Sequence, residues 1–273
     1  MESNHIENTG AYSKENAMFN LYKLGSSAAA ILSVLIGIVL FQYQMNGSRY
    51  FSSTSATTVS LILLSINVGF ALTPVFLFKK GVSFSEDHFA SVKYHFALPS
   101  AVAIVCSIAL LTSSSSTLVL ATALLALPSS AYTACIAIGK HKSLTAILGY
   151  FHIAFLVAIL SMLYTDFSIE LNAPMKLFIQ FTGMAAILSA LADIRIVIGK
   201  ESVGFYTFSK IAMMVLSFFT TIGVFFEVIP NYESYGIAYV IFPLYFLSLT
   251  IPSTIRFFCS TLRAHASNTA NNA

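Results

Sequence analysis

Residues 174–226 read PMKLFIQFTGMAAILSALADIRIVIGKESVGFYTFSKIAMMVLSFFTTIGVFF, and two apolar runs in this stretch are joined by a short charged turn. The runs cover 174–198 and 204–226. Each is long enough to cross the hydrocarbon core of a bilayer, which takes about 20 residues as a helix. The apolar residues are continuous rather than alternating, which excludes a transmembrane barrel. The stretch therefore predicts an antiparallel pair of membrane-spanning helices.

The rest of the chain repeats this pattern of apolar runs and short loops. The predicted spans are 24–45, 56–78, 94–112, 117–138, 144–164, 174–198, 204–226 and 236–258. Only residues 112–116 separate the third span from the fourth, so these two spans form a tight helical hairpin or one re-entrant element. Two separate runs of near-spanning length favour the hairpin. The prediction is an all-α integral membrane bundle of eight transmembrane helices, with one membrane domain over 24–258.

Composition agrees with a chain dissolved in lipid. Hydrophobic residues make up 57% of the sequence and charged residues 9%, whereas a typical soluble domain carries roughly 25% charged residues. Because so few charged residues cannot cover a surface that faces water, we expect the lipid bilayer to surround most of the chain. The formal net charge of +3 is too small to indicate a nucleic-acid partner.

The basic residues predict the orientation of the chain. Of the 14 Lys and Arg residues, all but Arg49 and Lys176 fall in the termini and in the alternate loops on the same side. These residues are Lys14, Lys23, Lys79, Lys80, Lys93, Lys140, Lys142, Arg195, Lys200, Lys210, Arg256 and Arg263. By the positive-inside rule, both termini lie in the cytoplasm, and the expected location is the plasma membrane of the cell.

The segments outside the spans and the order of the spans suggest further divisions. Residues 1–23 are expected to form a cytoplasmic tail or an interfacial helix, and residues 259–273 a disordered cytoplasmic tail. Short matches between KGVSF at 80–84 and KESVGF at 200–205, and between PSS at 128–130 and PST at 252–254, suggest a duplication with halves 24–142 and 143–258. Parallel repeats of this kind occur in transporters.

Two charged residues within the spans predict an intramembrane ion pair. Asp193 precedes the turn near residue 201 by about as many residues as Lys210 follows it. Antiparallel packing then places both side chains at a similar depth, where we expect them to face each other. The ordinary interpretation is that this ion pair fixes the packing of the two helices of the hairpin. The alternative is a proton- or ion-coupling site.

Asn67, His152 and Gln180 are the uncharged polar residues that we single out in the second, fifth and sixth spans. Polar side chains in spans commonly hydrogen-bond to a neighbouring helix and hold the bundle together. The alternative is that these three residues line one polar cavity near the midplane. The other histidine in a span, His95, lies near the interface, so its depth does not match that of His152 for haem ligation.

The functional reading remains divided between two classes. The chain contains no nucleophile elbow, zinc-protease or P-loop motif, so the sequence disfavours an enzyme, and we expect no cofactor and no metal site. The leading hypothesis is transport or binding of a small solute or ion between two helical halves. The alternative is a non-transporting membrane subunit or scaffold that binds other membrane proteins. A cavity lined by His152 favours the former, and a solid bundle with a lipid-level groove favours the latter.

Overall fold

The chain is a multi-pass, all-α membrane protein. A computed structural model describes residues 2–45, 49–78, 82–84, 93–113, 116–138 and 142–264. Within this part of the chain, eight helices are long and apolar enough to cross a membrane. They are α1 (Glu2–Ile38), α2 (Ser55–Leu77), α3 (Ala97–Ser113), α4 (Thr117–Ile138), α5 (Lys142–Thr165), α6 (Pro174–Val197), α7 (Val203–Gly223) and α9 (Ala238–Cys259).

Shorter elements extend or connect these helices. They are the π-helical turns η1 (Val39–Tyr43) and η4 (Val224–Val228), the 3₁₀ turn η3 (Lys93–Phe96), the one-turn helix α8 (Tyr232–Tyr235) and the strands β1 (Val82–Phe84) and β2 (Leu262–Ala264). The π-helical turns continue α1 and α7, so the corresponding spans end at Tyr43 and Val228. The predicted hairpin of the third and fourth spans is confirmed, because α3 packs along α4.

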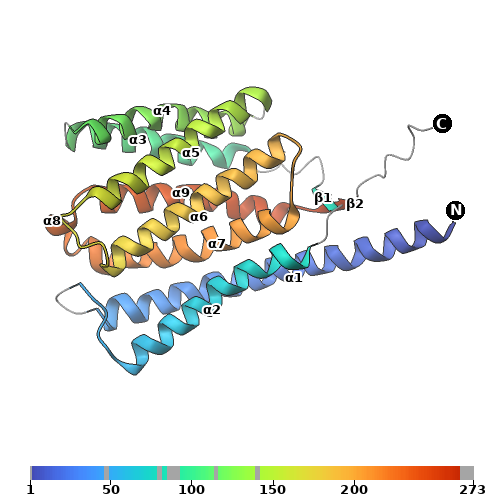
Figure 1. Cartoon of the computed structure of the whole chain (residues 1–273), viewed down its shortest axis with the longest axis horizontal. Helices are drawn as coiled ribbons and strands as arrows, with labels where there is room; N and C mark the ends of the chain where they lie inside the picture. The colour runs from blue at the N-terminus through green and yellow to red at the C-terminus, as the bar shows by residue number, and fades with distance from the viewer. Residues whose placement is uncertain are drawn as a thin grey trace.

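The first helix begins much earlier than the hydropathy pattern suggests. α1 runs without a break from Glu2 to Ile38, so the predicted tail or interfacial helix at 1–23 is instead continuous with the first span over the described residues. In Figure 1 this helix extends well past the end of the bundle. The apolar pattern predicts only the part of a helix that lipid surrounds, and it does not predict the polar turns before that part.

The helices form a layered bundle, in which α7 is the central member (Figure 1). α7 packs against α1 and α2 on one side and against α6 and α9 on the other, while α3, α4 and α5 form an outer layer that contacts α9 and α6. The span that contains α7 is the most buried of the eight. Neighbouring helices rather than lipid therefore surround α7, and its buried residues include Lys210 and several Ser and Thr side chains.

The arrangement of the two proposed halves differs locally. α6 packs against α5 and α7, its neighbours in sequence, whereas its counterpart α2 packs against α1 and, in place of α3, against α7. The duplication into 24–142 and 143–258 stays a prediction.

The start of α1 and the strand β2, the first and last described elements, lie at one end of the bundle (Figure 1), which we call the terminal face; the opposite end is the far face. At the terminal face, β1 and β2 pair antiparallel, with Phe84 opposite Leu262. β2 lies within the segment 259–273, for which a disordered cytoplasmic tail is predicted, and β1, which follows α2, supplies its backbone hydrogen bonds. The residues after 264 lie outside the described part of the chain.

Candidate functional site

The structure brings the two predicted charged residues together. Lys210 Nζ on α7 lies 2.9 Å from Asp193 Oδ2 on α6, and both side chains are buried. Asp193 is four residues from the end of its span and Lys210 seven residues from the start of the next. At 1.5 Å of rise per residue, the pair lies about 5–10 Å inside the terminal face.

A third charged residue, Arg256, joins this pair. Its Nη1 atom lies 3.2 Å from Asp193 Oδ1, and the residue is 0% exposed. The sequence analysis placed Arg256 among the cytoplasmic surface charges and missed this contact. The position of Arg256, three residues before the end of the α9 span, gives it a depth similar to that of Asp193. This match in depth was the signal that could have predicted the contact. We call Asp193, Lys210 and Arg256 the charged triad.

Hydroxyl groups complete the surroundings of Lys210. Its ammonium donates to Ser189 Oγ at 2.7 Å and to Ser253 Oγ at 3.3 Å. The face of the Tyr206 ring packs against the same ammonium, with the nitrogen 5.1 Å from the ring centre. The charge of Lys210 is therefore held by hydrogen bonds from two helices and by the face of an aromatic ring, as a buried cation requires.

A second polar cluster lies deeper in the bundle, around His152. The Nδ1 atom of His152 on α5 is 2.8 Å from Ser129 Oγ on α4 and 3.3 Å from the hydroxyl of Tyr245 on α9, and these two hydroxyls are 2.9 Å apart. All three residues are buried, and His152 lies near the middle of its span. We call Ser129, His152 and Tyr245 the imidazole cluster.

Tyr132 connects the imidazole cluster to the charged triad. Its ring stacks on His152, with ring centres 4.9 Å apart. Tyr132 also packs in one buried cluster with Ile194, the residue after Asp193, and with Phe96, whose ring centre lies 5.9 Å from the Arg256 guanidinium. The buried hydroxyl of Tyr132 makes no hydrogen bond with the described residues. Titratable side chains thus extend from mid-membrane to the triad.

The structure does not bring the three predicted cavity residues together. Asn67 on α2 donates to the carbonyl of Ala29 on α1 at 2.7 Å, which is the helix-to-helix bond that the ordinary interpretation predicts. The amide nitrogen of Gln180 on α6 makes no hydrogen bond with the described residues. Only His152 belongs to a polar cluster, and its partners Ser129 and Tyr245 were not anticipated.

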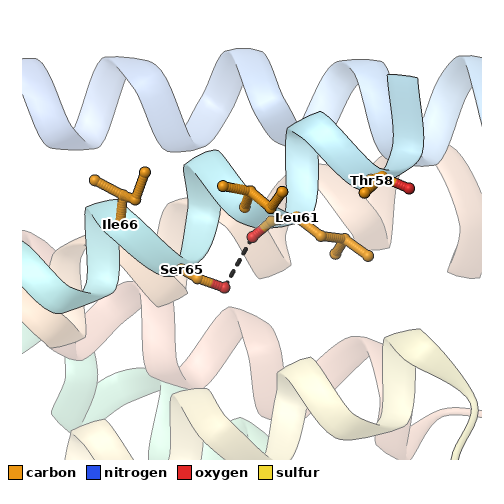
Figure 2. A pocket seen from close by; sticks show the side chains of 5 residues that line it. Thr58, Leu61, Ser65 and Ile66 are labelled. Atoms are coloured by element: carbon orange, nitrogen blue, oxygen red, sulfur yellow. Dashed lines mark hydrogen bonds between the residues drawn. The ribbon is translucent and has the colours of Figure 1, made fainter. Parts of the chain in front are cut away.

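Two clefts open on the surface that faces lipid. A shallow hollow of about 480 Å³ follows α2 and includes Leu61 and Ser65, whose hydroxyl donates to the Leu61 carbonyl at 2.8 Å (Figure 2). An apolar groove of about 510 Å³ lies between α2 and α6 with α7 as its floor, and Gly69, Phe181 and Ala212 are among its lining residues. Neither cleft is lined by the charged triad or the imidazole cluster.

Aromatic rings close the terminal face above the triad. Phe84 of β1 contacts Tyr206 of α7 and Phe19 of α1, and Phe257 of α9 contacts both Phe19 and Tyr206, with ring centres 4.8–6.4 Å apart. The Phe84 amide donates to Glu201 Oε1 at 3.1 Å. We call these four rings the aromatic cover. Since Tyr206 also contacts Lys210, the cover lies directly over the charged triad.

Polar side chains also gather at the far face. The Tyr235 hydroxyl donates to the buried Glu227 carboxylate at 2.9 Å, and the Arg49 guanidinium lies 5.1 Å from the Tyr235 ring centre. Burial, followed by the charge of Glu227, raises the pKa of Tyr235 above its ordinary value. The Tyr50 hydroxyl donates to Glu170, which raises the pKa of Tyr50 as well. These contacts join the loops of the far face.

Comparison with protein-family models, with curated proteins and with solved structures finds no match to this chain. The functional argument therefore depends on the geometry of the bundle. Five helices, α4, α5, α6, α7 and α9, direct buried polar and charged side chains into one region between mid-membrane and the terminal face.

Proposed function

We propose that this membrane protein transports a small solute or ion, and that its central site is formed by the charged triad and the imidazole cluster. The observation that carries the proposal is the convergence of three charged side chains, one imidazole and several hydroxyls in the interior of the bundle. Ionisable groups inside a membrane are costly, and in membrane proteins they mark substrate and ion pathways. The proposed site differs from the cavity expected from the sequence, since Asn67 and Gln180 are not part of it.

The arrangement supports a closed conformation of such a transporter. Aromatic rings cover the site at the terminal face, and Phe155 packs against Tyr245 on the opposite side of the imidazole cluster, with ring centres 5.3 Å apart. Alternating access requires a state in which the central site is shut off from water on both sides. Pro128 and Pro252 each immediately precede a hydroxyl residue of the site, Ser129 and Ser253, and proline weakens the helix at such positions.

The second candidate function is that of a non-transporting subunit that binds another membrane protein. The apolar groove between α2, α6 and α7 favours it, because an apolar groove at bilayer depth accepts the side chains of a partner helix. In this case the charged triad serves only to fix the packing of α6, α7 and α9, and the interior stays dry.

Cysteine accessibility tests the proposal. In a background in which Cys106, Cys135 and Cys259 are replaced by alanine, Ser129→Cys and Ser253→Cys place a thiol in the site. Ser33→Cys places one at an equally buried position on α1, away from the site. Each variant is reacted with a small, membrane-impermeant thiol reagent in sealed vesicles of both orientations.

A transporter samples open states, so both site thiols react many-fold faster than the Ser33→Cys thiol from at least one side of the membrane. Equal and negligible reactivity at all three positions contradicts transport and supports the scaffold.

A further inference from the structure

We infer that the far face carries a separate binding site, in which Asp166 binds the protonated amine of a small organic cation. The site is a cavity of about 350 Å³ where α3, α4, α5 and α9 meet. Small-molecule sites typically have volumes of about 300–1,000 Å³, apolar walls and a few polar groups. The cavity shares no lining residue with the charged triad or the imidazole cluster, so this inference does not rest on the transport proposal.

The cavity combines a buried apolar part with exposed hydroxyl groups. Leu110 of α3 and Phe242 of α9 are buried, and Val119 of α4 is half-buried. Ser116 and Thr165, which carry hydroxyls, are exposed. A ligand that matches this lining has an apolar body and one polar end.

Asp166 decides which polar end the cavity accepts. It is the one charged side chain among the described residues that line the cavity. Its Oδ1 atom accepts from the amide and the hydroxyl of Ser168 at 2.9 and 2.6 Å, and the buried hydroxyl of Tyr239 on α9 also interacts with this carboxylate. An ionised carboxylate has about four acceptor sites, so capacity for a further donor remains. A charged donor such as an ammonium group forms the strongest bond of this kind.

The ammonium of Lys176 lies close to Asp166 but binds a different part of the residue. It is buried and donates to the main-chain carbonyls of Asp166 and Ile169. Lys176 is not among the residues that line the cavity, so a ligand amine and Lys176 meet Asp166 at different atoms. The cavity is open to water at its exposed hydroxyls, where salt screens the repulsion between the two cations.

The depth of the cavity indicates two sources for the amine. Thr165 is the last residue of its span and Ala238 the first of its own, and Phe242 lies about 6 Å deeper at 1.5 Å of rise per residue. The cavity therefore lies where the helices leave the membrane. A free amine in the water and the headgroup of an ethanolamine phospholipid both present the same protonated primary amine at this level.

Binding of matched probes by the purified full-length protein in detergent tests the inference. The cationic probes are butylamine and phenethylamine, and the neutral controls are 1-butanol and 2-phenylethanol. Thermal unfolding midpoints and calorimetric Kd values are recorded at about pH 7, where a primary amine is protonated. We expect at least one amine to bind about tenfold or more tightly than its matched alcohol, because only the amine forms a charged hydrogen bond with Asp166.

Three variants locate the binding site. Asp166→Asn keeps an acceptor oxygen for Ser168 but removes the charge, so amine binding should weaken about 10- to 100-fold while alcohol binding is unchanged. Glu233→Gln removes an exposed carboxylate of the far face outside the cavity and should change neither. Val119→Phe places a ring in the cavity and should abolish amine binding, which tests the site independently if Asp166→Asn does not fold.

Phospholipids added to the micelles identify the source of the amine. If an ethanolamine phospholipid displaces the soluble amine and a glycerol-headgroup phospholipid does not, the site binds the lipid headgroup. If neither lipid displaces it, the site binds a free amine.

The inference is overturned if no amine binds, if the alcohols bind as tightly as the amines, or if both lipids displace the amine equally. Equal effects of Asp166→Asn and Glu233→Gln overturn it as well. None of these outcomes bears on the transport proposal, because the reactivity of the Ser129→Cys and Ser253→Cys thiols is measured without any ligand.

Discussion

Asp193 holds two cations at once, and this makes the members of the charged triad unequal. Removing Lys210 leaves the contact between Asp193 and Arg256 in place, whereas removing the charge of Asp193 leaves two buried cations close to each other. A simple ion pair is symmetrical in this respect. The presence of Arg256 therefore changes which substitution is the most harmful.

We predict that Asp193→Asn destabilises the protein by about 3–5 kcal/mol, the cost of leaving buried charge uncompensated. Lys210→Met should cost about 1.5–3 kcal/mol, the range of hydrogen bonds to a charged group. Arg195→Gln, at an exposed position two residues from Asp193, serves as the control and should change stability by less than about 0.5 kcal/mol. Denaturant unfolding in detergent measures all three. Equal losses for the first two variants would show that Arg256 adds nothing to the site.

For single residues, the sequence predicts only the contacts between helices that follow each other directly in the chain. Asp193 and Lys210 lie on consecutive antiparallel helices, so their distances from the turn give their depths directly. Arg256 is 63 residues from Asp193 and meets it only because α9 packs against α6 and α7. The partners of His152 come from α4 and α9 in the same way. No spacing along the chain encodes such packing.

Seven of the eight spans were predictable to within two residues at each end, because lipid sets a minimum length for an apolar helix, whereas the first span begins at Lys14 and not at residue 24. The predicted span 94–112 coincides with the observed one, and 174–198 ends one residue late. The pairing of β1 with β2 had no comparable signal, since each strand has three residues and six of the eight spans separate them. The close approach of two helices has one sign in the sequence, which is a glycine at the point of contact.

Gly204 and Gly69 form a matched pair for testing helix packing. A Cβ atom at Gly204 would lie 2.6 Å from the backbone oxygen of Pro74, where α7 meets α2, while a Cβ atom at Gly69 meets nothing within 4 Å. We predict that Gly204→Ala destabilises the protein by about 1–3 kcal/mol through overpacking. Gly69→Ala should instead be neutral or stabilise it by up to about 1 kcal/mol, because alanine favours the helix. Thermal unfolding compares them, and a tolerated Gly204→Ala would contradict the close contact of α2 with α7.

A substitution in the aromatic cover tests whether the cover controls access to the charged triad. Phe84→Ala removes the ring between Tyr206 and Phe19, so water and reagents reach the triad more readily. The Ser253→Cys thiol should then react at least severalfold faster from the terminal face than it does with the cover intact. Phe167→Ala, which removes an exposed ring near the far face, should leave the rate unchanged. If both substitutions have the same effect, the cover does not control access.

For the whole molecule, we propose an orientation in the membrane from the distribution of basic residues. The positive-inside rule assigns the terminal face to the cytoplasm, and we propose that the chain lies in the plasma membrane with both termini inside. The charged triad then lies on the cytoplasmic side of the midplane, so a substrate bound there is in position for exchange with the cell interior.

Labelling of intact cells checks this orientation. A thiol at Ser53→Cys, in the exposed loop between α1 and α2, should react with an impermeant reagent added outside the cells. A thiol at Lys14→Cys, on the polar part of α1, should react only after the membrane is permeabilised. The opposite pattern would invert the bundle and place the triad near the outer surface.

The pairing of β1 with β2 has a consequence for biosynthesis. The ribosome delivers β1 between the second and third spans, but β2 emerges only after all eight spans have been made. Until then Phe84 lacks its partner strand, and the aromatic cover is incomplete. Insertion of the spans into the bilayer therefore precedes completion of the cover.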